Sequence, residues 1–77
     1  MRSYSEGLLT WAMDAADNDE EIAGILLDRF EKEINRLLPG DGYIDMETCQ
    51  PIGADLAPEA WEELLQETAN RIALEIE

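Results

Sequence analysis

Carboxylates are the side chains with which this chain can do chemistry. The 77 residues include 19 aspartates and glutamates, 5 lysines and arginines and no histidine, which gives a formal net charge of −14. Glu59, Glu63 and Glu67 recur at steps of four residues, a spacing that places side chains along one face of a helix. Carboxylates in such numbers can transfer protons, coordinate a cation, or present a negative surface to a basic partner.

An enzyme would need further groups that this chain lacks. No histidine is present to act as a base or a ligand, and Cys49 is the only cysteine. The only serines, Ser3 and Ser5, lie at the start of the chain, where helix ends fray. A glycosidase needs two carboxylates lining a substrate cleft, and a short helical chain has little room for one. We therefore expect a protein that is not an enzyme, with no catalytic residue and no cofactor.

The spacing of the acids does not match a calcium site. An EF-hand loop carries oxygen ligands at alternating positions, glycine at the sixth position and glutamate at the twelfth. A loop counted from Asp17 would have Ile22 sixth and Asp28 twelfth. A loop counted from Asp41 would have Met46 sixth. The sequence therefore predicts no specific metal site.

Apolar residues at helical spacing predict the first two of three helices. The first helix runs from about Ser3 or Ser5, either of which can cap it, to Ala16. The second helix follows a cap at Asp17 or Asn18 and carries the clearest apolar stripe of the chain. The residues of this stripe are Ile22, Ile25, Leu26, Phe30, Ile34, Leu37 and Leu38.

Proline and glycine mark the remaining helix boundaries. Pro39 and Gly40 end the second helix, and Pro58 is well placed in the first turn of a third. Gly24 lies inside the second helix beside Ala23, which predicts the close approach of another helix at that point. The expected core consists of Trp11, Leu26, Phe30, Ile34, Trp61, Leu65 and Ile72.

Residues 40–57 connect the second and third helices and show no helical spacing. Tyr43, Ile44 and Met46 can form a short extended segment, but no second strand-like run exists to pair with it. The connector is therefore expected to be either an ordered loop packed on the helices or an edge that pairs with another molecule. The predicted fold is mainly α, a compact three-helix domain over residues 1–77 with a long ordered connector between helices two and three.

Cysteine usage and hydropathy indicate the compartment. Cys49 is alone and cannot form a disulfide within the chain, which favours a reducing cytoplasm. The first residues lack the basic start of a signal peptide, and their apolar run is too short to span a membrane. A surface this negative would also be repelled by anionic lipid headgroups. We expect a cytoplasmic protein with no membrane partner.

The net charge exceeds the few units that a small domain needs for solubility, which indicates a basic partner. Carboxylates one helical turn apart are spaced by about 6 Å, within roughly a factor of two of the spacing of backbone phosphates. Such a surface can occupy a basic nucleic-acid-binding groove of a protein and would not bind nucleic acid directly. The expected partner contacts come from the connector and the third helix: Asp41, Tyr43, Asp45, Glu47, Asp55, Glu59, Glu62, Glu63 and Glu67.

In size, charge and single-domain form, the chain resembles small acidic inhibitors from phages and mobile elements, including anti-CRISPR proteins that act as DNA mimics. Residues 17–45, DNDEEIAGILLDRFEKEINRLLPGDGYID, are also similar in layout to the immunity proteins of nuclease colicins. That second resemblance implies Tyr43 as an anchor, although it stands alone where the family has a tyrosine pair. It also implies charged contacts from Glu20, Glu21 and Asp28. Both resemblances imply an inhibitor that blocks a CRISPR effector subunit or a nuclease.

A different class of function stays open. The chain can be a small helical interaction module or subunit, antitoxin-like or an assembly partner, that binds through an apolar helix face. Ala23, Gly24 and the off-stripe Leu74 would suit such a face, and a homodimer is one form of it. Salt separates the two classes, because screening weakens a charged interface and leaves an apolar one almost unchanged.

Overall fold

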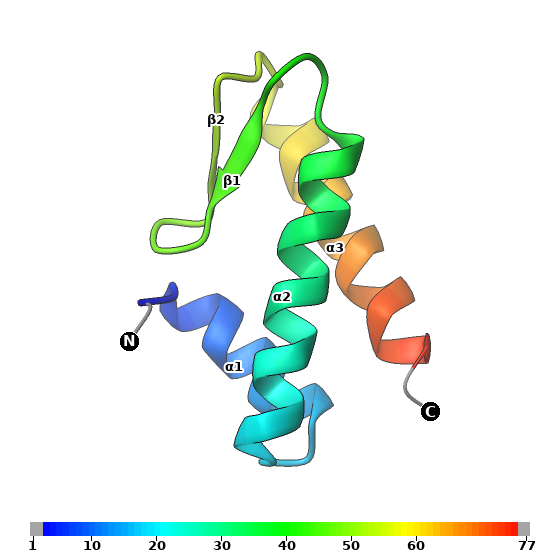
Figure 1. Ribbon diagram of the computed structural model, residues 1–77. Coiled ribbons are helices and arrows are strands. Elements are labelled where there is room, and N and C mark those ends of the chain that lie inside the picture. Colours follow the sequence, from blue (N-terminus) through cyan, green and yellow to red (C-terminus); the bar gives the residue numbers. More distant parts are fainter. Residues whose placement is uncertain (1–2, 76–77) are drawn as a thin grey trace.

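Three helices and a short hairpin make up the computed structural model, which describes residues 3–75 (Figure 1). In chain order the elements are α1 (Glu6–Ala15), α2 (Glu20–Leu37), β1 (Tyr43–Asp45), β2 (Gln50–Ile52) and α3 (Pro58–Glu75). The expected mainly α fold with three helices is confirmed. α2 is the central element, because α1, α3 and β1 all pack against it (Figure 1).

The helix starts are fixed by side-chain caps. Ser5 precedes α1, and its hydroxyl accepts a hydrogen bond from a backbone N–H of the first turn at 3.3 Å. Asp19 precedes α2 and accepts one from the backbone N–H of Glu21 at 3.0 Å. The cap of α2 is therefore one residue later than Asn18, the nearer of the two predicted caps. Asp17 and Asn18 instead have φ values of 54° and 64°, and this left-handed pair turns the chain between the helices.

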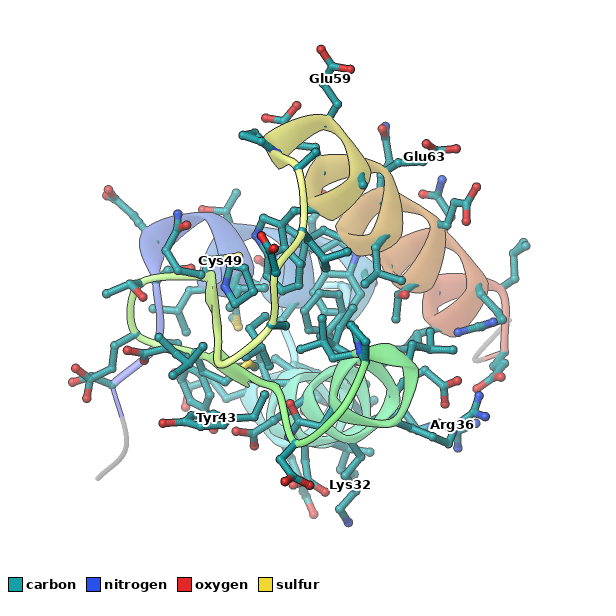
Figure 2. All side chains as sticks on the ribbon, turned by 90° about the horizontal axis from the view of Figure 1, so that it is seen from above. Lys32, Arg36, Tyr43, Cys49, Glu59 and Glu63 are labelled. Atoms are coloured by element: carbon teal, nitrogen blue, oxygen red, sulfur yellow. The ribbon has the colours of Figure 1, made fainter. Side chains whose placement is uncertain are left out.

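The core lies where α1, α3 and the hairpin meet α2, and the three helices enclose a central region filled with side chains (Figure 2). Trp11 and Leu65, both expected in the core, are only half-buried. Ile44 and Met46 of the connector are 1% and 2% exposed and are core residues that the sequence analysis did not include. The expected core residues that are buried are Leu26, Phe30, Ile34, Trp61 and Ile72.

Within residues 3–75, no helix packs against one face of the first half of α2. Ile22 and Ile25 are 40% and 63% exposed, although both belong to the predicted apolar stripe. No described atom outside α2 lies within 4 Å of a Cβ built on Gly24. The expected close approach of another helix at Gly24 is therefore wrong. Ala23 beside it is buried, so the packed face of α2 passes one residue to the side of the glycine.

The connector forms an antiparallel hairpin. Ile44 of β1 lies opposite Pro51 of β2, and the pairing continues on either side of them. The expected extended segment is present, but the prediction that it has no partner within the chain is wrong. The sequence did not predict the second strand, because that strand is three residues long and has a proline at its centre. Within sheets, proline is normally confined to edge strands and strand ends.

Backbone groups of the hairpin are hydrogen-bonded to the first two helical segments. The N–H of Ile44 donates to the Oδ1 of Asn35 on α2 at 2.8 Å. The N–H of Ser5, which caps α1, donates to the carbonyl oxygen of Met46 at 2.7 Å. The hairpin is thereby held against α2 and against the start of α1.

The other side of the connector is held by α3 and by a close backbone contact. The indole N–H of Trp61 donates to the carbonyl oxygen of Cys49 at 3.1 Å. At the base of the hairpin, a Cβ on Gly42 would lie 2.7 Å from the Cβ of Ala54, closer than two carbon atoms can pack. Glycine at position 42 therefore lets the two ends of the connector meet.

Replacing Asn35 by alanine is expected to lower the free energy of unfolding by about 1–3 kcal/mol, because the N–H of buried Ile44 loses its acceptor. Asn70→Ala, at an exposed position of α3, is the matched control and should change stability by less than about 0.5 kcal/mol. Urea denaturation followed by circular dichroism measures both. Equal losses in the two variants would show that this hydrogen bond does not hold the hairpin.

Replacing Gly24 by alanine is expected to raise the free energy of unfolding by about 1 kcal/mol, because the methyl group meets open space and alanine favours the helix. Gly42→Ala should have the opposite effect, because its Cβ collides with Ala54. Thermal unfolding of both variants tests this contrast. A loss of stability in Gly24→Ala would contradict the open environment of that residue.

Candidate functional site

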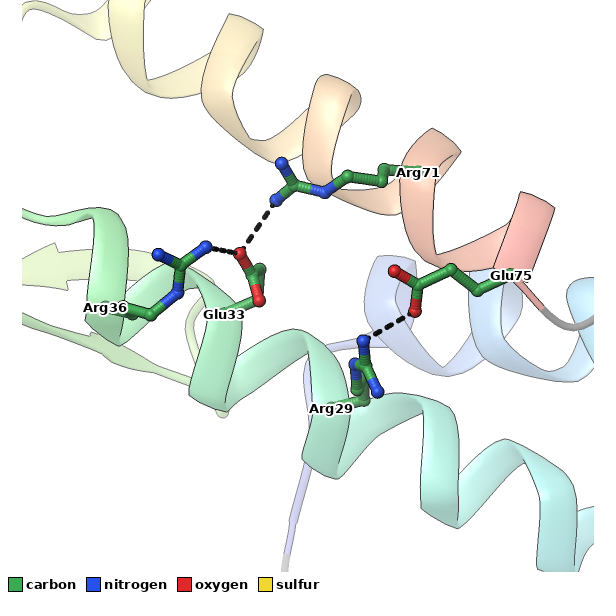
Figure 3. Close-up of polar contacts among 5 residues, drawn as sticks. All are labelled: Arg29, Glu33, Arg36, Arg71 and Glu75. Atoms are coloured by element: carbon green, nitrogen blue, oxygen red, sulfur yellow. Dashed lines mark hydrogen bonds and ion pairs between the residues drawn. The ribbon is translucent and has the colours of Figure 1, made fainter.

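Ion pairs gather along the seam between α2 and α3 (Figure 3). Arg71 of α3 contacts the Oε1 of Glu33 on α2 at 3.0 Å, and Arg36 of α2 contacts the same oxygen. Arg29 of α2 reaches Glu75 near the end of α3 at 2.7 Å. These contacts set attraction against the repulsion that so many carboxylates would otherwise exert between the two helices.

The arginines around Glu33 hold the pKa of its carboxyl below the ordinary glutamate value. The hydrogen bond from Arg36 is the largest cause, partial burial opposes it, and the charges of Arg36, Arg71 and Arg29 add to the lowering. Because the pKa is lower in the folded state than in the unfolded state, this carboxylate stabilises the fold above its unfolded pKa. The stabilisation is lost as the pH falls through the folded value.

The remaining described cation pairs within α2. Lys32 contacts Asp28, one turn earlier on α2, at 3.0 Å. Every lysine and arginine within residues 3–75 thus contacts a carboxylate on α2 or α3. Residues 37–70, which we call the acidic segment, contain no lysine or arginine. The eight carboxylates of the acidic segment are Asp41, Asp45, Glu47, Asp55, Glu59, Glu62, Glu63 and Glu67.

The acidic segment presents its charges to solvent. All of its carboxylate side chains are exposed except Asp45, which is half-buried. Asp45 has a local role, because its Oδ1 accepts a hydrogen bond from the N–H of Glu47 at 3.0 Å and shapes the hairpin loop. The exposed members are therefore the ones available to a partner.

The base of the hairpin brings two of these carboxylates together. Asp41 and Asp55 lie far apart in sequence, but each is next to one of the residues in the close contact between Gly42 and Ala54. Asp55 also lies four residues before Glu59, at the entrance to α3. Carboxylates therefore follow the chain from the base of the hairpin into the first turn of α3.

The carboxylates of α3 and the tyrosine of β1 lie on different faces. Glu59 and Glu63 project from one side of the molecule, whereas Tyr43 projects from the opposite side, where Lys32 also lies (Figure 2). Tyr43 is 52% exposed, so its ring is accessible, but it does not join the acids of α3. The predicted partner-binding residues are therefore divided between two faces.

The acids implied by the resemblance to immunity proteins are exposed on α2. Glu20 and Glu21 lie in its first turn, where the helix dipole favours negative charge. Asp28 is paired with Lys32. These three carboxylates therefore have structural roles in the isolated chain, independent of any partner.

A groove between α1 and α3 was not expected from the sequence. Its volume is about 690 Å³, and it is lined by Leu8 and Trp11 of α1, Phe30 of α2, and Leu65 and Ala69 of α3. The rings of Trp11 and Phe30 lie 5.2 Å apart between centroids. The sequence signal for this groove was the apolar stripes of the first and third helices. Such stripes are normally interpreted as core-facing, so they did not predict an exposed groove.

The described part of the chain has neither a thiolate at neutral pH nor a cluster of metal-ligating side chains. Burial raises the pKa of the Cys49 thiol, and a hydrogen bond with Ser5 opposes this only in part, so the thiol stays protonated at neutral pH. Among residues 3–75, no group of three or more histidine, cysteine, aspartate or glutamate side chains is placed to hold a metal ion. Over the same range, no helix is both long and apolar enough to cross a membrane.

Comparisons with protein-family models, with curated proteins and with solved structures find no match to this chain.

Replacing Glu33 by glutamine is expected to lower the melting temperature at neutral pH and low salt, because Arg36 and Arg71 lose their shared carboxylate. Glu63→Gln is the matched control, and it should leave the melting temperature unchanged or raise it, because it removes repulsion from an unpaired acid. The deficit of Glu33→Gln should shrink once the pH falls below the folded pKa of Glu33. Thermal unfolding across this pH range measures it, and equal effects in both variants would contradict the role of the seam.

Proposed function

We propose that this protein is a non-enzymatic acidic inhibitor that blocks a basic nucleic-acid-binding surface of a target protein by DNA mimicry. The observation that carries the proposal is the separation of charge. All cations of residues 3–75 are engaged by carboxylates on α2 and α3, while the acidic segment has eight carboxylates and no cation. Such a field attracts lysine- and arginine-lined grooves and repels nucleic acid itself.

The frame that carries these charges supports tight binding. Hydrogen bonds tie the connector to Ser5, which caps α1, to Asn35 of α2 and to Trp61 of α3. The backbone that carries its acids is therefore held in place before a partner arrives. A preformed surface loses little conformational entropy on association. Charge attraction also speeds the encounter, and added salt weakens it.

We infer that the primary contact is the face of α3 and the base of the hairpin. Its carboxylates follow the chain from the base of the hairpin along α3, which suits a basic groove that follows a phosphate chain. Tyr43 projects from the opposite side, so a target seated on Glu59 and Glu63 would not cover it unless it wrapped around the molecule. This division favours the DNA-mimic form over the immunity-protein form, in which Tyr43 would be the anchor.

The proposed target is a CRISPR effector subunit or a nuclease, since both hold nucleic acid in basic channels and are blocked by occupation of those channels. The proposed compartment is the cytoplasm, which the unpaired Cys49 supports. Inhibition of this kind needs no catalytic group and no cofactor in the inhibitor.

A second candidate function is a small interaction module, antitoxin-like or an assembly partner, that binds through an apolar surface. The groove between α1 and α3 favours it, because Trp11 and Leu65 are left half-buried there. A complex held only by this groove would resist salt, whereas one held by the acidic segment would not.

The double variant Glu59→Lys with Glu63→Lys should abolish inhibition while the fold is kept, because both positions are exposed. The charge-matched control is Glu6→Lys with Asp14→Lys, which changes the net charge equally at exposed positions outside the acidic segment. Glu6 matches Glu59, because each lies in the first turn of a helix.

The measurement has two steps. Proteins captured from a bacterial lysate at low salt are eluted with rising salt, and each is then tested for release of a labelled DNA duplex by the wild-type chain and by both variants. Release by wild type and control, but not by the Glu59 and Glu63 variant, supports the proposal. Full release by that variant, or captured proteins that bind no DNA, would contradict it.

A further inference from the structure

The helices form an incomplete bundle. α1 and α3 both pack against α2 but make little contact with each other, and the groove lies between them. Phe30 forms its floor, and Gly7 and Ala69 give its two walls small residues that admit another chain closely. A fourth helix laid in this groove would contact all three helices at once.

Two large apolar residues of the groove are only partly covered. Trp11 and Leu65 lie on apolar stripes that predict full burial, yet both are half-buried because no element of residues 3–75 lies over them. From Glu62 to Ala69 the wall of α3 rises about 10 Å, roughly two helical turns. Two turns accommodate apolar side chains at positions i, i+4 and i+7 of a docked helix, the pattern of helix-in-groove recognition.

The charge around the groove selects its occupant. Glu62 is the only charged residue among its described lining residues. Its α1 and α3 walls belong to residues 3–28 and 37–70, two stretches that contain no lysine or arginine. A second copy of the chain would bring another net charge of −14 to this surface and be repelled. A helix with lysines and arginines beside its apolar stripe complements both the apolar lining and the negative charge of the groove.

We propose that the groove between α1 and α3 docks one amphipathic, basic helix of the partner protein. The apolar stripe of that helix covers Trp11 and Leu65, and its cations face Glu62. This inference rests on the proposed function for the basic character of the partner. It adds an apolar anchor that gives the complex a component resistant to salt.

The probe is a synthetic alanine-rich peptide of about 18 residues, a length at which such peptides begin to form helices in water, with leucines at i, i+4 and i+7 and a few lysines on the flanks of that stripe. A scrambled peptide of the same composition keeps the charge and loses the stripe. Titration at about 0.15 M salt, followed by amide NMR shifts, should show binding of the patterned peptide at least roughly tenfold tighter than the scrambled one. The shifted signals should be those of Leu8, Trp11, Leu65 and Ala69.

Leu65→Gln should weaken the patterned peptide by roughly tenfold, whereas Leu64→Gln, the neighbouring half-buried leucine outside the groove, should not. Gly7→Gln against Gly24→Gln gives a second matched pair, because both glycines have open space at Cβ and only Gly7 lines this groove. Circular dichroism of every variant checks the fold.

The outcomes separate this inference from the proposed function. If the patterned and scrambled peptides bind equally and salt abolishes the binding, the proposed docking in the groove is overturned and the proposed function as an acidic inhibitor stands. Equal binding of a glutamate-bearing peptide with the same leucine stripe would overturn the basic occupant and would also count against the proposed function. Self-association of the free protein that Leu65→Gln abolishes would show a second copy in the groove and overturn the proposal.

Discussion

Electrostatic self-repulsion is the constraint on which the rest of this structure depends. A net charge of −14 on 77 residues opposes any compact arrangement, and few cations are present to offset it. The fold places Arg29 and Arg71 across the α2–α3 seam, where two acidic helices must approach. Most of the other acids are exposed to water, where their repulsion is screened. The arrangement that lets the chain fold also leaves the acidic segment free for a partner.

The second demand on the fold is a sufficient core. A chain of this length buries a smaller fraction of its surface than a larger domain does, and α1 and α3 use α2 as their common support. The connector supplies Ile44 and Met46 to that core, so the hairpin is structural as well as a carrier of charge. What the core does not cover, above Trp11 and Leu65, is the groove.

The helices could be predicted because Leu26, Phe30 and Ile34 repeat every four residues and because Pro39 and Pro58 mark boundaries. The second strand could not, since Gln50–Ile52 has no alternation and a central proline. The carboxylates of the candidate site could be predicted from composition, but the division of the site residues between two faces could not. The direction of Tyr43 depends on hairpin register, and a shift of one residue would reverse it. The groove exists because α1 and α3 make little contact with each other, and no local sequence pattern predicts this.

The anchoring of the hairpin has a thermodynamic consequence. The connector is hydrogen-bonded to Ser5 before α1, to Asn35 of α2 and to Trp61 of α3. One short segment therefore contacts all three helical regions of the fold. Order in the connector and packing of the helices therefore stabilise each other. A partner that grips only the connector would also stabilise every helix, including those that it never touches.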